Sequence, residues 1–237
     1  MEFISLLLFS DEGWGDELLR GLSVTLALAF ATAQLALVLS FLLAWGKNAR
    51  SPIARWFAFA STTVFRSLPE LLTLVIIYYQ LQLLLDWVVH LAFPNTSISL
   101  NAFAAGVVAL TLVFSALGSE VVRGAYQAVG KAQAEAAASL GLHRRQAFFL
   151  VVLPQMWRHC IPAFGNLWLI LLKDTSLVSI IAVNDLVRYT NMAISTTKKP
   201  FFFYTVLALI YVALALLSGI GQALLERRTA PRGGRGR

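Results

Sequence analysis

Ionisable side chains inside long apolar stretches are the residues of this sequence that could do chemistry. Arg66, Ser67 and Glu70 surround Pro69, and Asp174 lies within a second apolar run. An ionisable group in such a stretch is costly to bury and usually faces a cavity or a partner. We therefore take these four polar residues as candidates for a substrate path, in which Glu70 attracts a cationic group.

A purely structural role is the alternative around Pro69. Ser67 and Glu70 have the spacing of a capping box for a helix that starts near Pro69, and Arg66 could neutralise Glu70. If a helix starts at Leu68, its free N–H groups also form a natural site for a carboxylate. Substrate contact and helix capping both stay open for Glu70.

Two other charged pairs have simpler explanations. Lys173 and Asp174 are adjacent, so they do not face each other on one helix. Lys173 and Asp174 could hold their helix against its neighbours, or they could take part in the substrate path. Glu120 and Arg123, at positions i and i+3, most simply form a local pair.

No group of residues has the spacing of an enzyme or cofactor site. The sequence lacks the GxxxxGK[ST] phosphate loop, and its apolar stretches hold no nucleophile beside a base and no cluster of metal ligands. The single Cys160 excludes an internal disulfide and a cysteine metal cluster. We expect that this chain is not an enzyme and binds no cofactor itself.

The composition indicates that much of the surface is in contact with lipid. Of the 237 residues, 58% are hydrophobic and 13% are charged, whereas soluble domains have about 25% charged residues. The net charge of +7 does not indicate nucleic-acid binding, because the lysines and arginines lie at the ends of apolar blocks. The expected partner of this surface is a lipid bilayer, and no nucleic acid is expected.

Five apolar stretches are long enough to cross a bilayer as helices, which takes about 20 residues each. Continuous runs of this kind differ from the short alternating segments of an outer-membrane barrel. The sequence predicts an all-α polytopic membrane protein with a single transmembrane domain over residues 1–237. The predicted spans are Leu22–Trp45, Trp56–Leu85, Phe103–Val122, Ile161–Val183 and Phe201–Leu225.

The second stretch, Trp56–Leu85, is longer than one span requires. As a continuous helix its length would be roughly 45 Å, more than the hydrocarbon thickness. A break near Pro69 is therefore expected either in the middle of the membrane or near its inner surface.

The positions of the positive charges predict the orientation. Most lysines and arginines fall on the cytoplasmic side if the N-terminus is outside and the C-terminus is inside. The C-terminal residues 226–237 then form a flexible basic tail near anionic lipid headgroups. The longest cytoplasmic segment lies between the third and fourth spans and is also basic.

Residues 131–154 of that segment predict a short helical hairpin. The stretch Gln133–Phe149 is rich in helix-forming residues and is interrupted once, by Gly141, which indicates two short helices around a turn. Pro154 is expected to end the second helix. An amphipathic helix that lies on the membrane surface is the simpler alternative.

The hairpin carries the motif of a known family. Glu135, Ala136 and Ala137 are followed at the proper spacing by Gly141 and then by Leu153 and Pro154. This pattern resembles the EAA loop of ABC importer permeases. The segments around Arg66–Leu72, Val122–Ala125 and Lys173–Leu177 resemble further landmarks of the polar amino-acid uptake subfamily, and Glu70 resembles the permeases for histidine, lysine, arginine and ornithine or for opines.

The resemblance implies a mechanism and a set of partners. It implies a permease subunit of the bacterial inner membrane that imports a polar, cationic amino acid or an opine. The implied partners are a second permease subunit, two ATP-binding subunits and a periplasmic substrate-binding protein. ATP and magnesium would bind to the ATP-binding subunits, which would dock on Glu135, Ala136, Ala137, Gly141, Leu153 and Pro154. The acidic residue at position 70 favours a permease heterodimer over a homodimer.

Two other function classes fit the composition alone. An ion-coupled secondary transporter or a channel subunit would also consist of apolar helices with a few charges. Neither needs a cytoplasmic docking hairpin for an ATPase, so co-purification with an ATPase subunit would separate them from an ABC permease.

Overall fold

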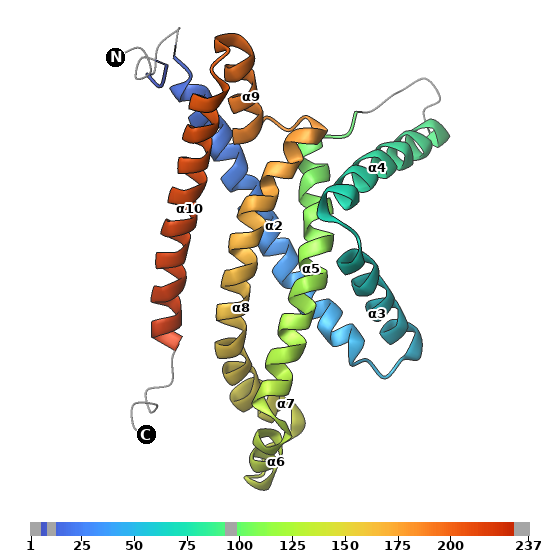
Figure 1. The fold of residues 1–237 in the computed structure, drawn as a ribbon. Coiled ribbons are helices and arrows are strands. Elements are labelled where there is room, and N and C mark those ends of the chain that lie inside the picture. The colour runs from blue at the N-terminus through green and yellow to red at the C-terminus, as the bar shows by residue number, and fades with distance from the viewer. Residues whose placement is uncertain (1–5, 9–12, 93–98, 230–237) are drawn as a thin grey trace.

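The computed structural model describes residues 6–8, 13–92 and 99–229, and in these ranges it contains helices and no strand. Figure 1 shows the helices as a bundle, with α6 and α7 at one end and α9 at the other. The prediction of an all-α fold is confirmed. The elements are α2 (Gly15–Lys47), α3 (Pro52–Ser67), α4 (Glu70–Ala92), α5 (Ala102–Val129), α6 (Lys131–Ser139), α7 (Arg144–Ala147), the π-helix η1 (Phe148–Val152), α8 (Leu153–Asp174), the 3₁₀-helix η2 (Thr175–Ile181), α9 (Leu186–Thr197) and α10 (Pro200–Thr229).

Five of these helical segments are long and apolar enough to cross a membrane, as predicted. They are α2, α4, α5, the continuous run Arg144–Ile181 and α10. Several boundaries differ from the prediction: α2 begins at Gly15, the second span is α4 alone, α5 continues to Val129, the fourth span begins at Arg144, and α10 continues to Thr229. Residues 226–229 of the predicted tail are therefore helical, and residues 230–237 lie outside the described residues.

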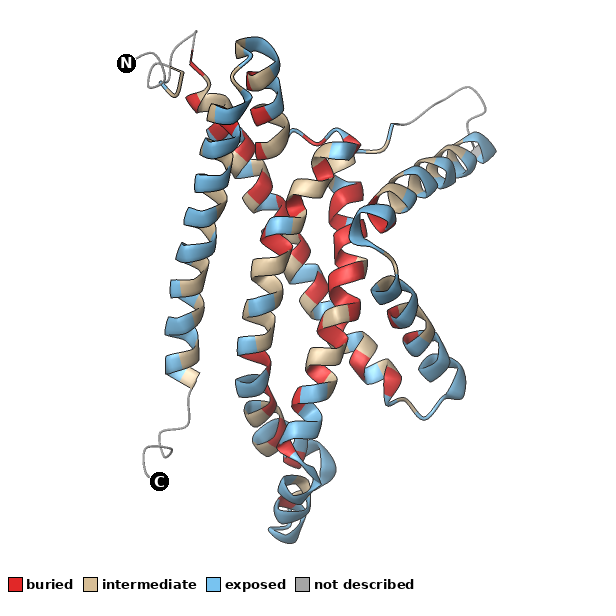
Figure 2. Cartoon of the chain, in the orientation of Figure 1, coloured by how far each residue is buried: buried red, intermediate tan, exposed pale blue. Residues whose placement is uncertain are grey.

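Helix α5 is the central element of the bundle. It packs against α2, α3, α4 and α8, and Figure 2 shows it as the most continuously buried helix. Small residues such as Ala109, Ser115 and Gly118 line its buried surface, which lets neighbouring helices approach closely where lipid gives no hydrophobic drive for association. A Cβ atom at Gly118 would collide with Ser40 of α2.

Helix α10 is the most exposed span. Two polar contacts join it to α8: the Trp168 indole donates to Ser218 at 3.1 Å, and the Gln222 amide donates to the Pro162 carbonyl at 3.3 Å. Its other side carries exposed residues such as Leu209 and Leu216. This surface suits contact with acyl chains.

Helix α9 is fixed to the start of α2. Asp185 caps α9 by accepting a hydrogen bond from the Arg188 N–H at 2.9 Å, and the Leu186 N–H donates to Thr25 of α2 at 3.1 Å. The backbone of residues 185 and 186 lies directly against Gly21. A Cβ atom at Gly21 would lie 2.8 Å from the Leu186 Cα atom, so a glycine is required at this contact.

Replacing Gly21 tests this close approach. Gly21→Ala forces α9 away from α2, and we expect a loss of about 1–3 kcal/mol, as for other overpacked sites. Gly219→Ala in α10 is the matched control, because a Cβ atom there meets nothing within 4 Å. The thermal unfolding midpoint in detergent should fall for Gly21→Ala only. Equal midpoints for the two variants would contradict the packing described here.

Candidate functional site

The break between α3 and α4 lies beside α5, where the two helices form a V (Figure 1). Leu68 is extended, with a ψ of 140°, because the ring of the following Pro69 disfavours the helical conformation. Helix α4 then begins at Glu70. Leu74, fully buried in the same core cluster as Leu110 and Val178, anchors the first turns of α4 to the bundle.

The capping box predicted at this break is not formed. Ser67 is the last residue of α3, and its hydroxyl donates to the Thr63 carbonyl at 2.8 Å. The helix that follows begins two residues later than the capping box requires, so Ser67 is turned back into α3 and away from Glu70. Glu70 still benefits from its position in the first turn of α4, where the helix dipole favours a negative charge.

Asp174 lies near Glu70. It ends α8 where the chain tightens into η2, and η2 packs against α4. The charges of Glu70 and Lys173 both act on the Asp174 carboxyl. Among the described residues, no hydrogen bond or ion pair joins Glu70, Lys173 or Asp174 to another side chain. The break therefore brings together two carboxylates from different helices without a bound counter-charge.

One interpretation of the sequence had Arg66 neutralise Glu70, but Arg66 pairs with a different carboxylate. Its guanidinium lies 3.2 Å from Glu120 Oε1 of α5. The Lys47 ammonium binds the same oxygen at 2.7 Å, and the Arg123 guanidinium lies 3.2 Å from Oε2. The predicted local pair of Glu120 and Arg123 is confirmed, but it is one part of a cluster that joins α2, α3 and α5.

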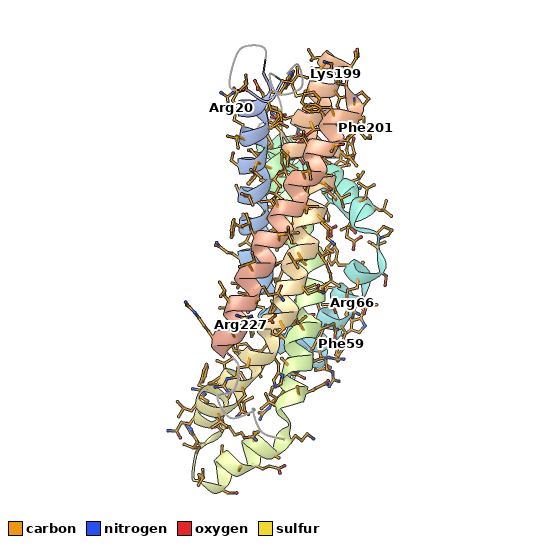
Figure 3. The ribbon with its side chains drawn as sticks, turned by 60° about the vertical axis from the view of Figure 1, so that its left-hand side comes forward. Arg20, Phe59, Arg66, Lys199, Phe201 and Arg227 are labelled. Carbon is orange, nitrogen blue, oxygen red and sulfur yellow. The ribbon has the colours of Figure 1, made fainter. Side chains whose placement is uncertain are left out.

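Two of these cations also lie over one aromatic ring. The Lys47 nitrogen is 5.6 Å and the Arg123 guanidinium carbon is 5.8 Å from the centre of the Phe59 ring on α3. Such contacts contribute attraction between a cation and the electron-rich ring face. Figure 3 shows Phe59 and Arg66 on the same helix, with Arg66 nearer to the break.

Lys47 is a residue that sequence reasoning missed. Its side chain is fully buried and donates a second hydrogen bond to Ser119 at 2.8 Å. In the sequence Lys47 directly follows an apolar run, where a lysine at a membrane boundary is ordinary. A partner that is 73 positions away leaves no signal in the local pattern.

The predicted hairpin forms at the end of α5. Gly130, with a φ of +73°, separates α5 from α6, and Gly141, with a φ of +83°, ends α6. The Leu142 N–H donates to the Ala137 carbonyl at 3.1 Å and the Gly141 N–H donates to the Ala138 carbonyl at 2.9 Å. These two bonds form a Schellman motif, whose left-handed position favours glycine.

The motif residues divide into an inner and an outer set. Ala137 is buried and faces the rest of the hairpin, whereas Glu135, Ala136 and Gly141 are exposed. Leu153 is half-buried and Pro154 is exposed at the base, where α8 begins. The outer surface thus offers a small side chain and an acidic group that another protein can approach closely.

Pro154 does not end the second helix, contrary to the prediction. Helix α7 passes through the π-helix η1 directly into α8, and Pro154 lies in the first turn of α8. Proline lacks the N–H that an α-helical turn would need, and the wider π-helical turn before it accommodates this loss. The hairpin is therefore joined to the fourth span without a loop.

Asp185 is a second buried charge that the sequence did not reveal. Its side chain is fully buried, and its Oδ2 atom has no hydrogen-bond partner among the described residues. Arg188 on α9 and the Tyr211 hydroxyl on α10 are the ionisable groups that interact with it. Burial raises the pKa of the Asp185 carboxyl to about 6.

None of the four residues of the predicted path lies in the apolar pocket between α2, α8 and α10, which Leu37, Phe164 and Trp168 line. Within the described residues, no group of three or more His, Cys, Asp or Glu side chains could hold a metal ion. Among the described residues the main polar features are thus the break, the Glu120 cluster, the hairpin and the buried Asp185.

A five-span helical bundle with a helix break before its second span and a helical hairpin after the third defines a membrane permease domain of the ABC transporter class. The comparison with family models agrees. Residues 36–231 match the model described as binding-protein-dependent transport system inner membrane component, so the chain belongs to this family.

Individual relatives confirm the resemblance to permeases for polar amino acids. The chain is 40% identical over 219 residues to the arginine ABC transporter permease protein ArtQ of Escherichia coli K12, which covers 87% of this chain and 90% of ArtQ. It is 34% identical to the histidine/lysine/arginine/ornithine transport system permease protein HisQ of the same strain, over 91% of this chain and 94% of HisQ. It is 32% identical to the octopine transport system permease protein OccQ of Rhizobium meliloti, over 97% of each chain.

A solved structure shares the fold. The crystal structure of an amino acid ABC transporter with histidines superposes with a TM-score of 0.79 at 31% identity, over 91% of this chain and 95% of that chain. The chain is therefore a permease of the polar amino-acid ABC importer class.

Asp185 gives a test by pH. Because the folded protein binds this proton more tightly than the unfolded chain does, the free energy of unfolding falls as pH rises from about 4 to about 6 and is constant above that. Lowering the pH from 7 to 5 should raise the free energy of unfolding by about 1 kcal/mol through protonation of the Asp185 carboxyl. Asp185→Asn keeps a capping oxygen and should remove this increase, measured as the shift of the unfolding midpoint. An equal shift in both proteins would contradict the assignment.

Proposed function

We propose that this chain is the membrane-spanning permease subunit of an ABC importer that moves a cationic amino acid or an opine into the cytoplasm. The observation that carries the choice of substrate is the pair of carboxylates at the helix break, Glu70 and Asp174, to which no cationic side chain among the described residues is bound. The relatives named for arginine, for histidine/lysine/arginine/ornithine and for octopine support the same class of ligand, because each of these compounds contains a basic group.

The proposed site lies in the bacterial inner membrane, with the hairpin in the cytoplasm. Arg227 lies toward the hairpin end of the bundle, whereas Arg20 and Lys199 lie at the opposite end (Figure 3). The hairpin adds Lys131, Arg144 and Arg145 to its own end. This distribution supports a cytoplasmic C-terminus and a periplasmic N-terminus.

The proposed complex contains a second permease subunit, two ATP-binding subunits and a periplasmic substrate-binding protein. ATP and magnesium bind to the ATP-binding subunits, and this chain performs no chemical reaction. Glu135, Ala136 and Gly141 form the outer surface on which an ATP-binding subunit docks, and Leu153 and Pro154 support it from below. Closure of the ATP-binding subunits then favours one of two conformations of the path.

A permease heterodimer is favoured over a homodimer. Glu70 lies on an exposed side of the break, so a second permease subunit can complete the path around it. An ion-coupled transporter or a channel would need no ATP-binding subunit. The hairpin, whose motif and fold fit a docking surface, favours the ABC importer.

The carboxylates of the break give the first test. With the complex and its binding protein in proteoliposomes, arginine, lysine, ornithine, histidine and glutamate are supplied in turn. We expect cationic substrates to stimulate the ATPase rate of the wild type. Glu70→Gln and Asp174→Asn should raise the apparent KM for the cationic substrate by about tenfold, because losing one charge-assisted contact costs about 1.5–3 kcal/mol. Unchanged KM values would remove both residues from the path.

The control for this test is Asp86→Asn. The Asp86 carboxylate accepts hydrogen bonds from Gln82 near the far end of α4. Because this site is away from the break, the substitution should leave KM unchanged. If no ATP-binding subunit co-purifies with the wild type, the permease function itself is wrong.

The hairpin gives a separate test. Gly141→Val places a branched side chain in a left-handed position, which costs roughly 1–2 kcal/mol and distorts the docking surface. The affinity of the detergent-solubilised permease for the ATP-binding subunit should fall by about five- to thirtyfold in a titration. Gly124→Val in α5 is the matched control, because a Cβ atom there also meets nothing within 4 Å but the backbone is right-handed. Equal affinities would show that the turn is not part of the docking surface.

A further inference from the structure

A single carboxylate, Glu120, holds together three helices that are far apart in the sequence. Its Oε1 atom accepts a hydrogen bond from Lys47 of α2 and forms an ion pair with Arg66 of α3, and its Oε2 atom forms an ion pair with Arg123 of α5. Among the described residues no other acidic side chain forms an ion pair with these three cations. Removing the Glu120 charge would therefore leave three positive groups close together without compensation.

The three cations of the cluster differ in their exposure and in the number of their other partners. The Lys47 side chain is fully buried, whereas Arg66 is 46% exposed and Arg123 is 36% exposed. Lys47 also has Ser119 as a partner, and Arg123 is on the same helix as Glu120. Arg66 is therefore the member whose pairing with Glu120 is least supported by other contacts and whose helix depends on it most.

The position of Arg66 means that the Arg66–Glu120 ion pair connects the helix break to α5. Arg66 lies two residues before Leu68, where the break begins, and the break leads directly to Glu70. On the other side of the pair, α5 runs without interruption from Glu120 to Val129, and the hairpin helix α6 begins after Gly130. The Arg66–Glu120 pair is thus a direct polar link between the helix that carries the hairpin and the break.

We propose that Glu120 is a positioning residue that couples the broken helix to α5, so that a displacement of the hairpin changes the position of Glu70. This inference depends on the proposed function, because it assigns the route by which docked ATP-binding subunits act on the path. Glu120 does not contact the substrate in this scheme. It acts through Arg66.

The coupling ratio tests the proposal. The number of cationic amino acids imported per ATP hydrolysed is measured in proteoliposomes that contain the complete complex and the binding protein. For Glu120→Gln we expect at least a threefold decrease of this ratio, while the ATPase rate is still stimulated by the binding protein. Glu226→Gln is the matched control, because Glu226 lies on α10 and accepts a hydrogen bond from Gln222 at 2.8 Å; it should keep the wild-type ratio.

A second variant covers the case in which Glu120→Gln fails to assemble. Arg66→Gln leaves the buried Lys47–Glu120 pair intact and should lower the ratio to a similar degree. If Arg66 acted only by contacting substrate, its loss would raise KM and leave the ratio at saturating substrate unchanged. The two substitutions combined should have little more effect than either alone, since they remove one link.

A distance measurement separates coupling from simple stabilisation. Spin labels at Val64 on α3 and Tyr126 on α5, both exposed, should keep one narrow distance distribution in the wild-type complex with and without ATP. In Glu120→Gln or Arg66→Gln the distribution should broaden or shift on addition of ATP. A wild type that imports no amino acid would refute the proposed function. A working wild type whose variants keep its coupling ratio and narrow distance would refute the coupling role alone.

Discussion

Backbone polar groups that lipid cannot satisfy are the constraint on which this structure depends. Each unsatisfied N–H or C=O costs several kcal/mol in hydrocarbon, so spanning segments are helical and an interruption must be covered by protein or by a polar path. Here the chain is interrupted at Leu68 and Pro69, between α3 and the second span, and the interruption lies against α5. Helices α3 and α4, on either side of the break, both pack against α5, so protein covers the break on that side.

Buried charged groups, like buried backbone groups, need partners within the protein, and the Glu120 cluster provides them. A fully buried lysine requires a close counter-charge, because a lone buried cation is far more costly than a paired one. Lys47 finds that charge on α5, and the same carboxylate also receives Arg66 of α3. Sharing one acceptor among cations from three helices fixes their relative positions more strictly than three separate pairs would. The carboxylates at the break, in contrast, have no such partner among the described residues, which is why the proposed function assigns them to a ligand.

The sequence was sufficient for features that depend on local order. Apolar run length predicted the five spans, and the single glycine within a run of helix-forming residues predicted the turn at Gly141. Interactions between distant segments were not predictable in this way. One interpretation of the sequence paired Arg66 with Glu70, four positions away, but in the structure Arg66 shares Glu120 with Lys47. Pro154 was expected to stop a helix, because a pattern of residue types does not show that a π-helical turn can absorb the missing N–H.

On the proposed function, the geometry of the break also explains why one chain would form only part of the path. Glu70 is exposed, and its neighbours Leu71 and Leu72 are exposed apolar residues in the first turn of α4. A carboxylate beside apolar side chains on an open surface would be costly to expose to lipid. A second permease subunit that covers this surface would exclude lipid and leave a polar space enclosed by two chains. The exposed break and the exposed hairpin then face different partners, and α5, which touches the first and leads into the second, is the element that both partners can move.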